Sequence, residues 1–206
     1  MMLEANALGC VRGDRRLFSQ VSFQLGAGSL LQVQGPNGSG KTSLLRMICG
    51  LLQPAEGEIR WQGKTIQSIG EDYFADLAYV GHRNGLKEEL SSMENLSISS
   101  GLAGFAAGRE ECATILQSMG LAGREHLPAR LLSEGQRRRS SLARLLVTRK
   151  PLWLLDEVFT SLDSAAVGML KKLIGDHLSG GGIAVVATHQ ELDIRAGSFQ
   201  RLELAS

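Results

Sequence analysis

The stretch GPNGSGKTS, residues Gly35 to Ser43, constrains the fold of this chain more than any other feature. It follows the apolar run LLQVQ and leads into the helix-like run SLLRMICGLL, so a strand, a glycine-rich turn and a helix come in direct succession. Glycines lack a Cβ, which lets the backbone curl around an anion with several N–H groups pointing inward. The following helix aims the positive end of its dipole at the same anion. The pattern G-x-x-x-x-G-K-[ST] therefore predicts a loop that holds the phosphates of a nucleotide.

Two residues of this loop have distinct predicted tasks. Lys41 supplies a mobile cation for the β- and γ-phosphate oxygens, and the Thr42 hydroxyl is a ligand for Mg²⁺. The competing interpretation, a glycine-rich surface turn, is disfavoured because a strand precedes the loop and a helix follows it. The other predicted nucleotide-binding residues of the loop are Gly35, Pro36, Asn37, Gly38, Ser39, Gly40 and Ser43.

The length and composition favour one α/β domain. A chain of 206 residues with 43% hydrophobic residues can fill a single core. The formal charge of +1 gives no general basic field, so nucleic acid is not an expected partner. The three cysteines, Cys10, Cys49 and Cys112, are too far apart for a disulfide framework or an ordinary zinc site, which fits a reducing cytoplasm. Because no run approaches the ~18 apolar residues of a spanning helix, we expect a protein that does not cross a membrane by itself.

Changes of pattern along the chain predict its organisation. In the first thirty residues, Val21, Phe23 and Leu25 alternate with polar residues on VSFQL, which predicts an antiparallel β flap ahead of the phosphate loop. From about residue 87 to 135 the pattern becomes helical. We interpret this part as a helical lobe inserted in a single domain of residues 1–206.

Three apolar runs, LLQVQ, LWLL and IAVVAT, end abruptly in polar residues. Continuous apolar runs are typical of parallel strands buried on both faces. The polar residues are those from Gly35 onward, the pair Asp156 and Glu157, and the pair Thr188 and His189. Ligands of such sheets bind beyond the carboxyl ends of the strands. We therefore expect the three polar groups to meet around one nucleotide.

The residues at these strand ends predict phosphoryl transfer. Adjacent carboxylates after a strand point to opposite sides and can take separate roles. We assign Asp156 to the Mg²⁺ and Glu157 to the attacking water, as its general base or orienting group. His189 is predicted to bind the γ-phosphate and to fix the water with Glu157. The competing interpretations are a solvated acidic pair and a structural histidine, which the nearby phosphate loop disfavours.

The stretch LLSEGQRRRSSLARLL predicts a second helix N-terminus at which a phosphate can bind. The polar residues Ser133 to Gly135 open a helix whose Leu142, Leu145 and Leu146 share one face. Arg137 to Arg139 point in different directions within one helical turn, which predicts a solvated or ion-paired face rather than a nucleic-acid patch.

These segments resemble the motifs of the ABC ATPases. LSEGQ is similar to the LSGGQ signature, LLDE to the Walker B motif, and the SLD and ATH that follow to the D-loop and the H-loop, in the family's usual order. The resemblance covers the chain from near Met1 to His189. It implies an α/β P-loop NTPase with a parallel core sheet, an antiparallel β flap and an inserted helical lobe, which hydrolyses ATP with Mg²⁺. It also implies an ATP-dependent homodimer, because in that family two ATP molecules are sandwiched between two domains.

The resemblance implies further site residues outside the strand ends. Ser133 and Gly135, with Gln136 of the same signature, are expected to contact the nucleotide held by the other copy. Asp163 belongs to the segment that resembles the D-loop. His82 occupies the position at which the family has the Q-loop glutamine. The side-chain amide that usually lies near Mg²⁺ and the attacking water is therefore replaced by an imidazole.

Three other departures from the family pattern bear on nucleotide binding. Glu134 replaces a signature glycine, and Val158 replaces the proline that usually follows the catalytic glutamate. We expect ATP binding to tolerate both. No aromatic residue precedes Leu17, so the tyrosine that stacks on adenine has no obvious equivalent.

Within the family, the short chain and the stretches YVGHRNGLKEELSSMENL and LPARLLSEGQRRRSSLARLL resemble the ATP-binding subunits of bacterial haem export for cytochrome c maturation. This implies a transport ATPase, peripheral on the cytoplasmic face of the inner membrane, with integral-membrane partners of the CcmB and CcmC type. The alternatives are the ATPase of another small ABC exporter and a soluble ABC ATPase acting on nucleic acid. A GTPase or a small-molecule kinase is a further alternative, which the signature and the lack of an NKxD motif disfavour.

Overall fold

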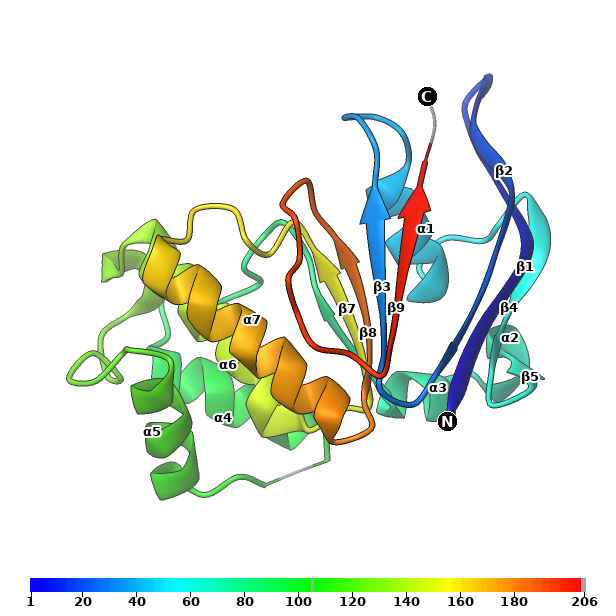
Figure 1. Cartoon of the computed structure of the whole chain (residues 1–206). Helices are drawn as coiled ribbons and strands as arrows, with labels where there is room; N and C mark the ends of the chain where they lie inside the picture. The colour runs from blue at the N-terminus through cyan, green and yellow to red at the C-terminus, as the bar shows by residue number, and fades with distance from the viewer. Residues whose placement is uncertain (105, 205–206) are drawn as a thin grey trace. The chain divides into compact units, whose positions relative to one another are not determined.

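A sheet with the phosphate loop at one strand end is the central feature of the computed structural model, which describes residues 1–104 and 106–204. Every residue of two of its inner strands, β7 (Leu152–Asp156) and β8 (Ile183–Ala187), is buried. The pairs β7–β8, β8–β3 and β3–β9 are parallel, and these strands lie side by side in Figure 1. The predicted parallel core sheet is thus confirmed. In spatial order its described strands are β6 (Leu77–Val80), β7 (Leu152–Asp156), β8 (Ile183–Ala187), β3 (Ser29–Gln34) and β9 (Ser198–Glu203).

The edge strand β9 is an element that the sequence pattern did not reveal. It pairs along the whole of β3, from Ser29 opposite Ser198 to Gln34 opposite Glu203. Its apolar residues Phe199 and Leu202 are three positions apart and so do not follow the two-residue period of a strand. Pairing with β3, rather than local pattern, accounts for this strand.

The second sheet is antiparallel and confirms the predicted flap. Alternate residues of β2 face the core, since Val21 and Leu25 are buried while Ser22 and Gln24 are exposed. Leu25 lies opposite Leu3 of β1 in the register of the hairpin. In spatial order the described strands are β2 (Arg15–Gly26), β1 (Met2–Arg12), β4 (Glu56–Trp61) and β5 (Lys64–Thr65).

Helix α1 (Lys41–Ile48) packs against β7 and β8 of the parallel sheet. Its apolar positions repeat with helical spacing, so Leu44, Leu45 and Ile48 are fully buried in one core with residues of both sheets. The chain thereby holds the residues just before this helix, which form the phosphate loop, against the ends of the parallel strands. The short helices α2 (Ile66–Ile69) and α3 (Glu71–Ala75) follow the flap.

The described chain divides into two compact units. The first holds Met1–Tyr79, Pro151–Glu157 and the described residues from Lys171 onward, and the second holds Val80–Lys150 and Val158–Leu170. The predicted domain, residues 1–206 with a helical lobe at about 87–135, includes Phe105, Ala205 and Ser206, which lie outside the described residues. Its boundaries stay a prediction.

The second unit is built on packed helices. Helices α4 (Ser92–Leu102), α5 (Arg109–Ser118) and α6 (Glu134–Thr148) contact one another, and a 3₁₀ turn (Ala129–Leu131) precedes α6. Serine caps begin α4 and α6, since Ser91 with Glu94 and Ser133 with Gln136 form reciprocal capping boxes. Helix α7 (Ser164–Ser179) leads back into the first unit. In the described part of the chain, no helix is long and apolar enough to cross a membrane.

The predicted solvated or ion-paired face at Arg137 to Arg139 is wrong for its middle residue. Arg137 pairs with Glu134 on the surface, but Arg138 is only 3% exposed. The reason is the helical period: residues 138, 142 and 145 lie on one face, which Leu142 and Leu145 turn inward.

Stability is expected to depend on pH through His177. Its ring stacks on Trp153 with centroids 3.8 Å apart, and Nε2 donates to the Ile183 carbonyl at 3.2 Å. Burial lowers the pKa of His177 from the usual value of 6.5, because the imidazolium is poorly solvated there. Unfolding therefore takes up a proton below about pH 6.5, so this contribution is complete above that pH and is lost as the pH falls through the lowered pKa.

Urea unfolding of the wild type and of His177→Gln measures this effect. The wild type should lose its advantage over the variant as the pH falls from about 7.5 to about 5, by at most about 1.4 kcal/mol per pH unit. A constant difference across that range would contradict the assignment. His126→Gln, at an exposed position, is the control for the loss of a histidine.

Candidate active site

The phosphate loop has a backbone that only glycine fits at its two ends. A Cβ on Gly35 would lie 2.4 Å from the Leu204 carbonyl oxygen, closer than atoms can approach. Gly40, the N-cap of α1, has a φ of 102°, and a Cβ there would meet the Phe18 ring at 2.9 Å. The loop is therefore held close to the neighbouring chain while its N–H groups stay available to an anion.

Lys41 lies across this loop. Its side chain is 7% exposed, and Nζ donates to the carbonyls of Gly35 at 2.7 Å and Pro36 at 3.1 Å. Beside it, the Ser39 hydroxyl is buried without a hydrogen-bond partner among the described residues. A buried polar atom without a partner is costly, so a phosphate oxygen that accepts from this hydroxyl fits the site.

A pair of hard oxygen donors lies at the end of the loop. Thr42 Oγ1 is 3.3 Å from Asp156 Oδ1, and Asp156 is 1% exposed. Mg²⁺ prefers a small number of such oxygens together with substrate phosphates, so this pair fits it. Within the described residues no group of three or more His, Cys, Asp and Glu side chains is arranged to hold a metal ion.

Tyr79 is a site residue that the sequence pattern did not reveal. Its hydroxyl donates to Asp156 Oδ2 at 3.3 Å, across 77 positions of the chain. Burial, and then the charge of Asp156, raise the pKa of Tyr79 to about 12, so the phenol stays a proton donor at neutral pH. The signal available was the position of Tyr79 at the end of the strand beside β7, because the carboxyl ends of neighbouring strands share an edge.

Glu157 and His189 meet beside the phosphate loop. His189 Nε2 is 3.5 Å from Glu157 Oε1 and 3.2 Å from Asn37 Oδ1. The Glu157 backbone has a φ of 52°, rare for a residue with a side chain, and its N–H donates to the Ala187 carbonyl at 2.9 Å. Strained backbone of this kind gathers at functional sites. The three strand ends thus come together as the sequence predicted.

The other candidate residues lie in the second unit. Ser133 and Gln136 form the capping box of α6, and a Cβ on Gly135 would lie 3.3 Å from the Ser161 carbonyl oxygen. Asp163 Oδ1 accepts from the Ala166 N–H at 2.8 Å at the start of α7. The remaining candidate, His82, is exposed. Their contacts with a nucleotide stay predictions.

Glu134, which stands in place of a signature glycine, is held by its neighbours. Its carboxylate accepts from Arg137 at 2.7 Å and from the Asn84 amide at 3.1 Å. The hydrogen bond from Arg137 is the main reason why the pKa of Glu134 is lowered. These contacts satisfy the added charge within the second unit.

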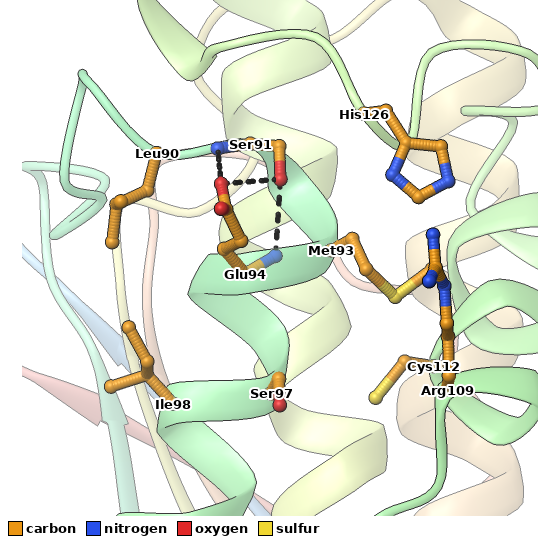
Figure 2. A pocket seen from close by; sticks show the side chains of 9 residues that line it. All are labelled: Leu90, Ser91, Met93, Glu94, Ser97, Ile98, Arg109, Cys112 and His126. Carbon is orange, nitrogen blue, oxygen red and sulfur yellow. Dashed lines mark hydrogen bonds between the residues drawn. The ribbon is translucent and has the colours of Figure 1, made fainter.

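A pocket of about 540 Å³ lies in the second unit between α4 and α5 (Figure 2). The Glu94 carboxylate on its wall is engaged by the N–H and hydroxyl of Ser91, both at 2.8 Å, in the capping box of α4. No predicted nucleotide-binding residue lines this pocket, so it is separate from the candidate active site. Its lining residues are Leu90, Ser91, Met93, Glu94, Ser97, Ile98, Arg109, Cys112 and His126.

The fold and the phosphate loop define a P-loop NTPase, and the chain belongs to the ABC transporter family, whose model matches residues 18–160. A similar protein is the cytochrome c biogenesis ATP-binding export protein CcmA of Nitrosospira multiformis, 56% identical over 202 residues, with 98% of each chain covered. At low identity, solved structures share the fold. An ABC transporter ATP-binding protein from Pyrococcus furiosus has a TM-score of 0.86 at 24% identity, covering 99% of this chain and 98% of that one. A dimeric post-hydrolysis ATP-binding cassette bound to ADP and Pi has a TM-score of 0.77 at 22% identity, covering 91% and 88%.

Proposed function

We propose that this chain is the ATP-hydrolysing motor subunit of a membrane ABC complex that serves cytochrome c maturation, by exporting haem or by releasing a haem-loaded carrier. The observation that carries the proposal is the meeting of Asp156, Glu157 and His189 with one phosphate loop. Similarity to CcmA over nearly the whole length of both chains supports the particular pathway.

The phosphate loop and its neighbours bind the nucleotide in this proposal. Lys41 exchanges its bonds to loop carbonyls for the β- and γ-phosphate oxygens of ATP, and the loop N–H groups surround the same phosphates. Thr42 and Asp156 would hold Mg²⁺, which would neutralise charge on the phosphates. Tyr79 keeps Asp156 in place through its hydroxyl.

Glu157 and His189 act on the γ-phosphate. Glu157 orients a water molecule and accepts its proton as the water oxygen bonds to the γ-phosphorus. The bond from that phosphorus to the bridging oxygen breaks, and ADP leaves with the electron pair. His189, 3.2 Å from Asn37 of the loop, donates a hydrogen bond to the transferred phosphoryl group and holds the water with Glu157.

Two copies would close around two ATP molecules. Ser133 and Gly135 of one copy contact the γ-phosphate bound by the other, and Gln136 and Asp163 belong to the same nucleotide-binding site. Because these contacts exist only in the closed state, ATP shifts the population toward it and hydrolysis reverses the shift. His82 would lie near the water and Mg²⁺ in place of the usual amide.

Integral-membrane subunits of the CcmB and CcmC type are the proposed partners, which would place the chain on the cytoplasmic face of the inner membrane. The exposed leucines of the second unit, Leu102 and Leu131, offer apolar surface for such contacts.

Deleting the gene is expected to remove covalent haem from c-type cytochromes, because haem delivery would lose its motor. Haem staining of membrane proteins after gel electrophoresis measures this loss, and re-expression of the wild-type chain is the control. Normal c-type cytochromes in the deletion strain would contradict a role in cytochrome c maturation and favour another small exporter. Copurification of membrane subunits with the chain would identify the complex.

A further inference from the structure

Two of the passages between the compact units lie next to proposed active-site residues. The chain passes from the first unit to the second between Tyr79 and Val80, and again between Glu157 and Val158. The first passage leads to His82, and the second follows Glu157 directly. A side chain that binds both the segment after Tyr79 and the segment after Glu157 can therefore influence His82 and Glu157.

Arg138 of α6 is such a group. Its Nη1 donates to the Gly81 carbonyl at 2.8 Å and to Asn84 Oδ1 at 3.3 Å, and its Nε donates to the Val158 carbonyl at 3.3 Å. Arg138 is only 3% exposed. It lies five residues after Ser133, the N-cap of the same helix. One planar guanidinium thus binds both segments to the helix that starts at the signature.

Glu157 is consequently held on both sides through its backbone. Its own N–H donates to the Ala187 carbonyl at 2.9 Å, and the carbonyl of the next residue, Val158, accepts from Arg138. A residue with a φ of 52° keeps that conformation only when its surroundings impose it. The Arg138 bond to the Val158 carbonyl is one such constraint, at the residue that follows Glu157.

We propose that Arg138 is a positioning residue of the ATPase reaction, which holds the segment that starts at Val158, directly after Glu157, and the segment around His82 on the signature helix. The inference deepens the proposed function and rests on it. A change at the start of α6, where the nucleotide of the other copy is proposed to bind, would move both segments together. Arg138 acts through Glu157 and His82 and is not itself proposed to touch the nucleotide.

Arg144 provides a matched comparison on the same helix. Its guanidinium donates to the carbonyls of Asn84 at 3.2 Å and Gly85 at 3.4 Å. It therefore holds the same segment that follows β6, through bonds of the same kind. Its other hydrogen bonds within the described chain are to Ser141 of the same helix, and it does not bond the Val158 carbonyl. Arg144 is therefore the control for a purely structural tether.

The test compares Arg138→Lys with Arg144→Lys in the full chain, purified with the membrane proteins that accompany it. Lysine keeps the charge but lacks the planar fork that reaches two carbonyls at once. For Arg138→Lys we expect kcat for MgATP to fall about 10- to 100-fold, because a small misplacement of a catalytic group has that effect. The Kd for ATP should stay within about twofold, since the phosphate loop is untouched. Arg144→Lys should keep kcat within about threefold.

Equal kcat values in the two variants, with an active wild type, would overturn the positioning role alone. A parallel loss of ATP affinity and kcat in Arg138→Lys would also overturn it, since a general structural defect has that result. If Arg138→Lys does not fold, as judged by its thermal unfolding midpoint, Arg138→Gln provides the same comparison. A wild-type preparation without ATP turnover would overturn the proposed function, and this inference with it.

Discussion

Replacing Lys41 by alanine is expected to abolish measurable ATP binding. The ammonium group lies 2.7 Å from the Gly35 carbonyl and 3.1 Å from the Pro36 carbonyl, at the mouth of a loop otherwise made of neutral donors. In the complex with ATP, this group would donate two hydrogen bonds to charged phosphate oxygens, each worth about 1.5–3 kcal/mol. Losing both raises the Kd for ATP by at least about 100-fold. Isothermal titration calorimetry with MgATP measures this change.

Lys64→Ala is the matched control, because Lys64 is an exposed lysine of the same compact unit, on strand β5. It should bind ATP as the wild type does. Unchanged ATP affinity in Lys41→Ala, with the fold intact by circular dichroism, would remove Lys41 from the proposed binding site.

Replacing Glu157 by glutamine is expected to leave ATP binding intact and to stop turnover. The amide has the size of the carboxylate but cannot accept the proton of the attacking water, so kcat should fall by at least about 100-fold. Because the contacts that close two copies depend on ATP, the variant should accumulate as an ATP-bound dimer. Phosphate release measures turnover, and light scattering with and without MgATP measures the dimer.

Glu191→Gln tests whether the loss of any nearby carboxylate has the same effect. Glu191 follows His189 by two residues but is 83% exposed and paired with Arg201 at 3.3 Å. Its turnover should match that of the wild type. Wild-type turnover in Glu157→Gln would exclude Glu157 as the group that activates water.

Much of the fold was predictable because its signals are local. The β flap shows a two-residue period around Val21, and the core strands are short apolar runs that end in polar residues. Such periods state directly which faces are buried. In the second unit, the serine caps also carry a local signal, a Glu or Gln three residues after the serine, although only the helix start at Ser133 was predicted and not the one at Ser91.

The parts of the site that the sequence did not predict depend on long-range contacts. Tyr79 reaches Asp156 across 77 positions, and Arg138 reaches Val158 across 20 and Gly81 across 57. A run of three arginines predicts a solvated helix face. Arg138 is nevertheless buried, because it lies on the same helix face as the buried Leu142. Local pattern carries no information on which segments become neighbours.

The sequence by itself predicted a phosphate loop from Gly35 to Ser43, and it placed Asp156, Glu157 and His189 at the ends of apolar strands. Both patterns are legible because glycine spacing and apolar runs act through adjacent residues. The tertiary structure alone decided the neighbours of those residues. It brought Tyr79 to Asp156 and gave the buried charge of Arg138 its carbonyl partners, because burial makes a polar group depend on whatever the fold places beside it.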